Sequence, residues 1–275
     1  MRDHKRIDLT TLVSQEKMKF IESIDGSEFL ITTVNIRGTE VKYFTNNKRL
    51  LWIAVGLEYI EPELLDWIDT IEEDRVFYDI GASNGPFSIY AAMKGLKVIA
   101  IEPEAQNFAL LEMNHYLNSN VIKYPVISLN IAISSKAELG KLFCEKYEGG
   151  MHCKILDKPL KVLQREKFEP AHCQYVIKNT LDNIIHKYKL PCPEYLKIDV
   201  DGSELELLKG AKRTLEDENV RSIFIEISNP DFEGKKIVEY VSLKGFGIKE
   251  MKQVQHYEGL YNFIFTRQRK YSIVA

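Results

Sequence analysis

The sequence predicts an α/β protein with a doubly wound, mostly parallel sheet and an N-terminal extension made of a β-hairpin and helices. Two observations predict the sheet. From residue 75 onward, short apolar runs alternate with helix-length segments, which is the pattern of successive βα units. Two of these runs, EYLKIDV and SIFIEIS, are continuously apolar rather than alternating, which indicates strands that are covered on both faces.

The extension occupies the first 70 residues. EFLITTVNI and TEVKYFT are β-favouring runs on either side of Arg37 and Gly38, so they predict a hairpin with a short loop. Residues 50–71 then place apolar side chains at helical spacing, and Pro62 is expected to start the second half of this helical segment. We therefore expect residues 1–70 to form the extension and residues 71–275 to form the main domain.

The main domain is expected to hold five successive strands, followed by two more. The five are VFYDI, KVIAIE, a strand within PVISLNIAI, EYLKIDV and SIFIEIS, with helices from Pro86 and over EAQNFALLEMNHYLN. FGIKEM and NFIFTR are strand candidates after the helical segment DFEGKKIVEYVSLK. Residues 136–174 are polar and lack clear periodicity, so we expect an inserted binding loop or mobile lid there rather than core.

Composition and charge exclude several classes of partner. The chain has 275 residues, of which 45% are hydrophobic and 28% charged, and a formal net charge of -3, so neither nucleic acid nor an acidic membrane is a favoured partner. No apolar run approaches the roughly 18 residues of a membrane span, and the start of the chain lacks the apolar core of a signal peptide. We expect a cytoplasmic protein.

The four cysteines show no C-x-x-C spacing, so no zinc ribbon or dithiol redox motif is predicted. Two His-Cys pairs, His152-Cys153 and His172-Cys173, lie in the 136–174 segment. Without local ligand spacing, incidental thiols in a solvated loop are favoured over a zinc site. We assign no metal ligand.

The loop GASNG after VFYDI is the strongest candidate for a ligand site. It leads into a helix start at the carboxyl end of a strand, which is where ligands bind in open α/β sheets. It lacks the middle glycine of G-x-G-x-x-G, and Asp79 precedes it while no Lys or Arg follows before Lys94, so a cation is favoured over a pyrophosphate. Glu102, which ends the next strand, fits an acidic residue that accepts hydrogen bonds from a ribose. These features predict a nucleoside with a positively charged end, such as S-adenosylmethionine.

Four segments, FYDIGASNGPFSIYAA, VIAIEPE, NTLDNII and LKIDVDGSELELLKGA, resemble in order and spacing the motifs of the FkbM-type family of S-adenosylmethionine-dependent methyltransferases. The resemblance spans roughly residues 57–227. It implies the class I methyltransferase fold, a Rossmann-like seven-stranded sheet whose last strand is antiparallel. It also implies O-methylation of a hydroxyl, with a carbohydrate or glycan precursor as the expected small-molecule or glycan acceptor.

The resemblance also implies a set of cofactor-binding residues. Those expected around the methionine part of the cofactor are Asp79, Gly81, Ala82, Ser83, Asn84 and Gly85. Glu102 and Pro103 would lie at the ribose and adenine, and the stretch from Asn130 to Ala132 would border the adenine.

Methyl transfer to a hydroxyl requires an aligned acceptor oxygen and the removal of one proton. Asp199 and Asp201 near the end of one strand, and Glu226 at the end of the next, are the catalytic candidates. For Asp201 we favour capping of the helix ELELLKGAKRTL, which Ser203 could also cap in a capping box, over a role as base. Lys197 is expected on the opposite side of its strand. A divalent metal would also lower the pKa of the hydroxyl, but no ligand spacing indicates one.

Two other functional classes stay open at this point. One is an NAD-dependent oxidoreductase of Rossmann type, which the missing middle glycine disfavours. The other is a non-catalytic protein that uses a cofactor-binding fold as an interaction module. Binding of S-adenosylhomocysteine, of NAD or of neither would separate the three classes. The sequence determines neither the acceptor nor the oligomeric state.

Overall fold

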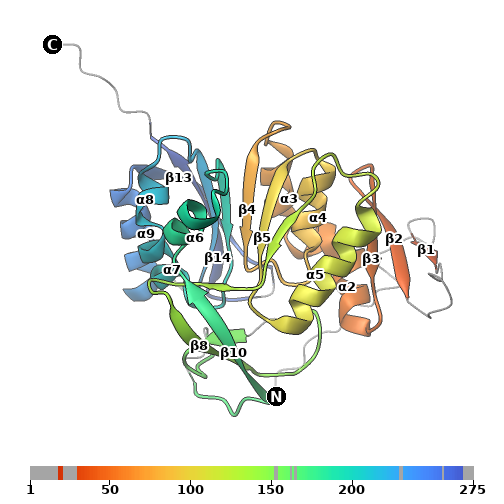
Figure 1. Cartoon of the computed structure of the whole chain (residues 1–275), viewed down its shortest axis with the longest axis horizontal. Coiled ribbons are helices and arrows are strands. Elements are labelled where there is room, and N and C mark those ends of the chain that lie inside the picture. The colour runs from red at the N-terminus through yellow and green to blue at the C-terminus, as the bar shows by residue number, and fades with distance from the viewer. Residues whose placement is uncertain are drawn as a thin grey trace.

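The computed structural model describes residues 18–20, 30–151, 154–161, 163, 166–228, 232–255 and 257–268. Within these residues the strands form a seven-stranded, a four-stranded and a three-stranded sheet. The seven-stranded sheet lies in the middle of the molecule, with helices on both sides (Figure 1). None of the described helices is long and apolar enough to cross a membrane.

The central sheet runs in the order β13-β14-β12-β11-β4-β5-β6. Its strands are β4 (Val76–Ile80), β5 (Lys97–Ile101), β6 (Ile127–Leu129), β11 (Tyr195–Ile198), β12 (Ser222–Ser228), β13 (Phe246–Gln253) and β14 (Leu260–Arg267). Neighbouring strands are parallel except at β14, which is antiparallel to both β12 and β13. This confirms the expected α/β sheet of seven strands. The chain runs from β4 outward through β5 and β6 and then crosses to β11, so the strand order reverses beside β4, where α/β folds bind ligands.

Two apolar clusters cover the two faces of this sheet. One face packs against α2 (Lys48–Ile60), α3 (Pro62–Asp69), α4 (Pro86–Met93) and α5 (Ala105–Asn118). The other packs against α6 (Leu181–Tyr188), α7 (Glu204–Gly210), α8 (Lys212–Glu216) and α9 (Phe232–Leu243). Phe77 and Phe224 point to the α2–α5 face, whereas Tyr78 and Ile225 point to the other. Burial on both faces explains why these strands are continuously apolar.

Local signals set where the helices begin. Asn47 caps α2 by accepting a hydrogen bond from Leu50 N, and Thr180 caps α6 in the same way. Proline occupies the first position of α3 and of α4, where its missing N–H leaves no helical hydrogen bond unmade. The predicted helix start at Pro86 is confirmed.

The N-terminal hairpin packs onto the main domain. β2 (Ile31–Ile36) pairs antiparallel with β3 (Thr39–Phe44), and β1 (Met18–Phe20) pairs antiparallel with β2. Val34 and Tyr43 belong to the same apolar cluster as α3 and α4. At the turn, the Arg37 guanidinium lies 2.8 Å from carboxylate oxygens of both Asp66 and Asp69 on α3. The described part of the extension therefore shares its core with the central sheet.

The expectation of an irregular loop over residues 136–174 was wrong for the described part of this segment, which forms strands. It contains β8 (Glu138–Cys144), β9 (Lys154–Leu156) and the start of β10 (His172–Asn179), which join β7 (Ala132–Ile133) in the four-stranded sheet. Leu142 and Val176 are buried on one face, while Leu139 and Ile177, which pair across β8 and β10, are exposed on the other. Apolar side chains on both faces conceal the alternation that would have indicated strands.

Candidate active site

The loop from Gly81 to Gly85 lies between β4 and α4, at the carboxyl edge of the central sheet. Gly81 and Gly85 adopt φ of +82° and +79°. A Cβ atom on Gly81 would lie 1.7 Å from Asp199 O, and one on Gly85 would lie 2.3 Å from Leu111 Cδ1. Gly81 is therefore required by the close approach of the backbone just after β11, whereas Gly85 is favoured by its positive φ and by the nearby Leu111 side chain of α5. Their first role is to let the loop pack closely against the rest of the protein.

Lys197 on β11 lies next to this loop and joins it to two carboxylates. Its Nζ lies 3.0 Å from Asp79 Oδ1 and 3.4 Å from Asp199 Oδ2, and it donates a hydrogen bond to Gly81 O at 2.9 Å. Ser88 donates to the other oxygen of Asp79 at 2.6 Å. The side chains of Lys197 and Asp79 are 3% and 1% exposed, so this ion pair is shielded from solvent. Burial alone would lower the pKa of Lys197, but Asp79 and Asp199 raise it overall.

The expectation that Lys197 lies on the opposite side of the strand was wrong. Residues two apart in an extended strand point to the same face, and the ion pair with Asp199 shows that Lys197 does so. Strand register also places Asp79 beside Lys197 on the neighbouring strand. Lys197 thus belongs to the candidate site, although it was not predicted there. The alternation of side chains along a strand would have placed it on the same side as Asp199.

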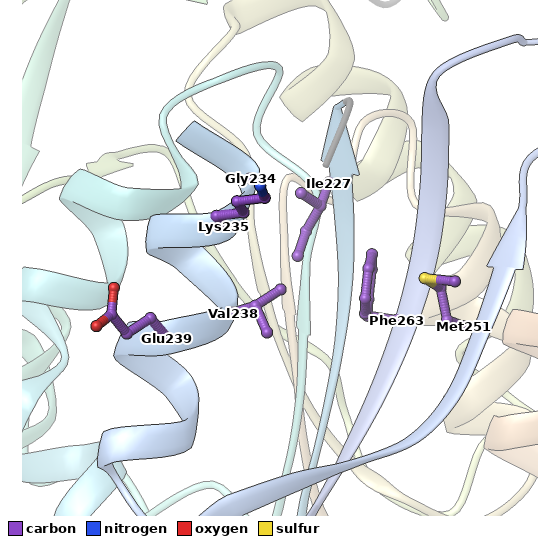
Figure 2. A pocket seen from close by; sticks show the side chains of 7 residues that line it. All are labelled: Ile227, Gly234, Lys235, Val238, Glu239, Met251 and Phe263. Carbon is purple, nitrogen blue, oxygen red and sulfur yellow. The ribbon is translucent and has the colours of Figure 1, made fainter. Parts of the chain in front are cut away.

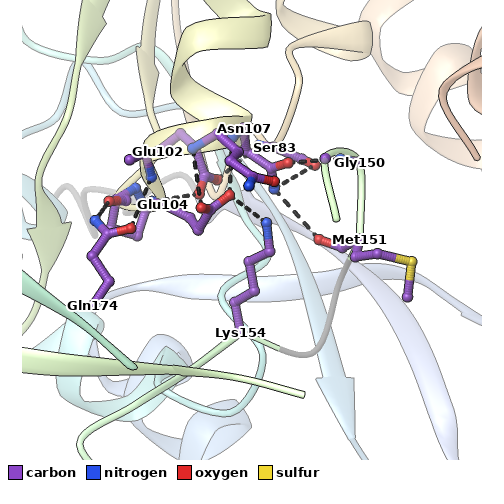
Figure 3. A network of polar contacts seen from close by, with 12 residues as sticks. Ser83, Glu102, Glu104, Asn107, Gly150, Met151, Lys154 and Gln174 are labelled. Carbon is purple, nitrogen blue, oxygen red and sulfur yellow. Dashed lines mark hydrogen bonds and ion pairs between the residues drawn. The ribbon is translucent and has the colours of Figure 1, made fainter. Parts of the chain in front are cut away.

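Glu102 directly follows β5 and reaches the glycine loop (Figure 3). Its two carboxylate oxygens accept hydrogen bonds from Ser83 N at 2.9 Å and from Glu104 N at 2.8 Å. Asn130 Nδ2 donates to the carbonyl oxygens of Glu102 and Pro103 at 2.9 and 3.1 Å. Burial raises the pKa of Glu102 to about 7, although the hydrogen bond from Glu104 N works in the opposite direction. The structure therefore brings together the predicted residues of three separate motifs.

Ala132, the last of the predicted cofactor residues, packs elsewhere. Its side chain is buried with Leu142 and Val176 in the apolar cluster of the four-stranded sheet. Its assignment to the adenine therefore rests on the family resemblance alone.

Residues from the 136–174 segment complete the network around Glu102 (Figure 3). Lys154 Nζ forms a buried ion pair with Glu104 Oε2 at 2.5 Å. Asn107 donates to Ser83 Oγ at 3.2 Å and accepts a hydrogen bond from Gly150 N at 2.8 Å. These residues could not be predicted from the sequence, because they carry no motif and meet only through chain folding.

Asp201 takes part in holding the same segment. Its carboxylate accepts a hydrogen bond from Lys154 N at 3.2 Å. The N-cap position of α7 belongs to Ser203, whose side chain makes no capping hydrogen bond, and Glu206 instead bonds Ser135 and Lys209. Asp201 is not the N-cap residue, so the capping role that we favoured for it is wrong, and the alternative capping box of Ser203 and Glu206 is not formed.

Three carboxylates gather next to the loop: one directly follows β11, one lies on β12 and one directly precedes α3. The register pairs Ile198 with Ile225, so Asp199, which directly follows β11, lies beside Glu226 on β12. Burial and then Asp199 raise the pKa of Glu226 well above its ordinary value. The same two causes raise the pKa of Glu61 to about 8. Within the described part of the chain, the side-chain carboxylates of Glu61 and Glu226 make no hydrogen bond or ion pair. Glu61 was not predicted, since nothing local marks it as part of a site.

Away from the loop, the described residues form an apolar cavity but no metal centre. Among the described residues, no group of three or more His, Cys, Asp or Glu side chains is arranged to hold a metal ion, and His152 and Cys153 lie outside these residues. An apolar cavity of about 400 Å³ lies between α9 and the strands β13 and β14 (Figure 2). It is lined by Ile227, Gly234, Lys235, Val238, Glu239, Met251 and Phe263. Ile227 points to the opposite face of the sheet from Glu226, so the sheet separates this cavity from the carboxylates.

This fold is a doubly wound α/β fold, and its candidate site lies where the strand order reverses, which is where such folds bind ligands. A family profile described as Methyltransferase FkbM domain matches residues 79–258, which is more than half of the chain. The chain belongs to the FkbM methyltransferase family, and it is an S-adenosylmethionine-dependent methyltransferase. The NAD-dependent oxidoreductase and the non-catalytic interaction module are thereby set aside.

The chain is similar to methyltransferases of several kinds. The hexuronic acid methyltransferase AglP of Haloferax volcanii is 26% identical over 192 residues, which cover 70% of this chain and 72% of that protein. The tRNA (guanine(37)-N(1))-methyltransferase of Anopheles darlingi is 27% identical over 124 residues, 43% of this chain and 24% of that protein. Among solved structures, precorrin-6y C5,15-methyltransferase from Geobacter metallireducens aligns with a TM-score of 0.45 and 15% identity, covering 76% of this chain and 87% of that chain.

The residues of the loop fit this cofactor. Asn84 Oδ1 is buried without a hydrogen-bond partner in the part of the chain that the structure describes, so an acceptor remains for a donor such as an ammonium group. Glu102 is fixed by two backbone N–H groups, and a carboxylate there can also accept hydrogen bonds from ribose hydroxyls. We propose that the predicted residues from Asp79 to Gly85, with Glu102, Pro103 and Asn130, hold the cofactor.

Proposed function

We propose that this enzyme transfers a methyl group to a hydroxyl of an uncharged carbohydrate, such as a glycan precursor. The observation that carries the proposal is the set of carboxylates of Asp199, Glu226 and Glu61. They lie beside the loop of residues 81–85, which we call the cofactor loop. Because the carboxylates of Glu61 and Glu226 have no partner within the described residues, their oxygens can bind the hydroxyls of a polyhydroxylated ligand. The similarity to a hexuronic acid methyltransferase supports a sugar as the acceptor.

S-adenosylmethionine supplies the methyl group. When the new oxygen–carbon bond forms and the sulfur–carbon bond breaks, the hydroxyl proton must go to a base. Asp199 is our first candidate for this base, because its neighbour Lys197 can balance the charge of the ionised carboxylate. Glu226, on the neighbouring strand β12, is assigned to binding the acceptor hydroxyls. Asp201 is assigned to holding Lys154 rather than to catalysis.

The charges around the site favour an uncharged acceptor over an anionic one. The ammonium of Lys197 is already paired with Asp79 and Asp199. A carboxylate on the acceptor would therefore approach the like charge of Asp199, and its desolvation would not be compensated. A neutral sugar instead offers hydroxyl donors to these same oxygens.

An acceptor panel tests this proposal. We expect a neutral methyl hexoside to be methylated with a kcat/KM at least about tenfold above that of the matching methyl hexuronide, which corresponds to about 1.4 kcal/mol. Methyl transfer from labelled S-adenosylmethionine would be measured, with a transfer RNA as a third acceptor. Transfer to the RNA without transfer to either sugar would overturn the proposed function. A preference for the hexuronide would keep the sugar but overturn the charge argument.

Substitution of the two strand-end carboxylates should separate their roles. Asp199→Asn is expected to lower kcat by about 10² to 10⁴, because general base catalysis contributes that much, while the affinity for S-adenosylhomocysteine stays nearly unchanged. Glu226→Gln is expected to raise the acceptor KM with a smaller effect on kcat. Steady-state kinetics with both variants would decide. A large loss of kcat in Glu226→Gln, together with normal turnover in Asp199→Asn, would reverse the assignment.

A further inference from the structure

Two asparagines of α5 hold the edge of the N-terminal hairpin. Among the described strands, β3 is the outer strand of its sheet, and no described strand pairs with its far edge. Asn118 Oδ1 accepts a hydrogen bond from Lys42 N at 3.0 Å, and its Nδ2 donates to Lys42 O at 2.8 Å. One helical turn earlier, Asn114 Oδ1 accepts from Phe44 N at 2.7 Å. The two side-chain amides thus take the place of the missing strand.

Asn114 also reaches the cofactor loop. Its Nδ2 donates to Asn84 O at 2.7 Å, so the two ends of one amide join the hairpin to the loop. The side chain of Asn118, in contrast, makes its three hydrogen bonds among the described residues to Lys42 and to Asn114 O. Tyr43 of the hairpin makes a second link to the loop region, since its hydroxyl donates to Pro86 O at 3.0 Å. Asn114 is fully buried, so water cannot replace either bond if the side chain is removed.

The peptide that Asn114 contacts is a critical part of the loop. Asn84 lies between Ser83 and Gly85, which both adopt positive φ, and Gly85 N donates to Ala82 O to close the turn. In such a turn, the direction of the Asn84 carbonyl sets the direction of the Gly85 N–H on the other side of the same peptide plane. A hydrogen bond from a buried amide therefore fixes how the loop presents its polar groups.

We propose that Asn114 is a positioning residue for the cofactor loop and that it makes the N-terminal hairpin part of the cofactor site. This inference rests on the proposed role of residues 81–85 in holding S-adenosylmethionine. It assigns to the hairpin a function in cofactor binding that its sequence does not suggest, because the hairpin itself carries no cofactor motif.

The experiment compares Asn114→Leu with the matched variant Asn118→Leu. Both leucines are close in size to asparagine and remove hydrogen bonds to β3, but only the first also releases Asn84 O. We expect both variants to lower Tm, and only Asn114→Leu to weaken S-adenosylhomocysteine binding, by roughly tenfold or more. Calorimetric titration of the full-length protein would measure the affinities.

Asn114→Asp keeps the test sharp if the leucine variant does not fold. An aspartate retains the acceptor for Phe44 N but donates to Asn84 O only when it is protonated. Its affinity for S-adenosylhomocysteine, relative to the wild type at each pH, should therefore recover as the pH is lowered. A purely structural role for Asn114 predicts no such recovery.

The outcomes separate this inference from the function on which it rests. Equal losses of affinity in the Asn114→Leu and Asn118→Leu variants, or a wild-type affinity in folded Asn114→Leu, would overturn the positioning role alone. If the wild-type protein itself failed to bind S-adenosylhomocysteine, the proposed cofactor site would be wrong as well.

Discussion

Replacing Lys197 with methionine is expected to lower the free energy of unfolding by about 3 to 5 kcal/mol and to abolish measurable cofactor binding. Methionine keeps most of the side-chain length but leaves the buried carboxylate of Asp79 without its cation. It also removes the hydrogen bond to Gly81 O, at the start of the cofactor loop. Chemical denaturation would give the loss of stability, and titration with S-adenosylhomocysteine would give the loss of binding.

The double variant Asp79→Asn with Lys197→Met is the control for this prediction. Removing one partner of a buried ion pair is costly because it leaves an uncompensated charge, whereas removing both leaves none. The double variant should therefore be more stable than Lys197→Met alone by at least about 1 kcal/mol. The single variant Asp79→Asn completes the comparison. If the double variant lost as much stability as the two single variants together, the ion pair would not be the source of the effect. Cofactor binding should stay weak in the double variant, because the contact with Gly81 is still missing.

Gly81→Ala is expected to lose at least about 3 kcal/mol of stability, or to bind S-adenosylhomocysteine about 100-fold more weakly if the loop shifts instead. The new Cβ atom would lie 1.7 Å from Asp199 O, which is a backbone atom that cannot rotate away. Either the loop or the end of β11 must then move. Both carry residues of the candidate site, so a shift of either should affect function.

Gly38→Ala is a matched control for the backbone strain. Gly38 adopts φ of +84°, close to the +82° of Gly81, but a Cβ atom on Gly38 would meet nothing within 4 Å. The control should therefore show only the cost of a non-glycine residue at positive φ, about 1 to 2 kcal/mol. Cofactor affinity in Gly38→Ala should equal that of the wild type. Similar effects of the two substitutions would show that strain, and not the contact with Asp199, requires glycine at position 81.

Much of the central sheet could be predicted because its strands are buried on both faces. The runs VFYDI and SIFIEIS coincide with β4 and β12, since continuous burial leaves an unbroken apolar run in the sequence. The third expected strand was less accurate. The run PVISLNIAI is divided between β6 and β7, which belong to different sheets. No local pattern reports such a division, because both parts are equally apolar.

The candidate site could be predicted only where a side chain stands at the end of a strand or in the loop that follows. Asp199 and Glu226 were predicted in this way, and Glu102 was predicted from its separation from Gly81 along the sequence. Glu61 and Lys154 come from a helix junction and from the 136–174 segment. Their positions depend on how these parts pack, so only the folded chain shows that they meet the other residues.

The sequence by itself determined the α/β class, the glycine loop and the kind of cofactor, because each depends on residue types within one or two neighbouring elements. Only the tertiary structure decided that the hairpin reaches the cofactor loop through Asn114, and that Lys154 pairs with Glu104. These contacts join residues that are 30 to 70 positions apart. Their formation depends on the packing of whole elements around the sheet, which hydrophobic periodicity does not encode.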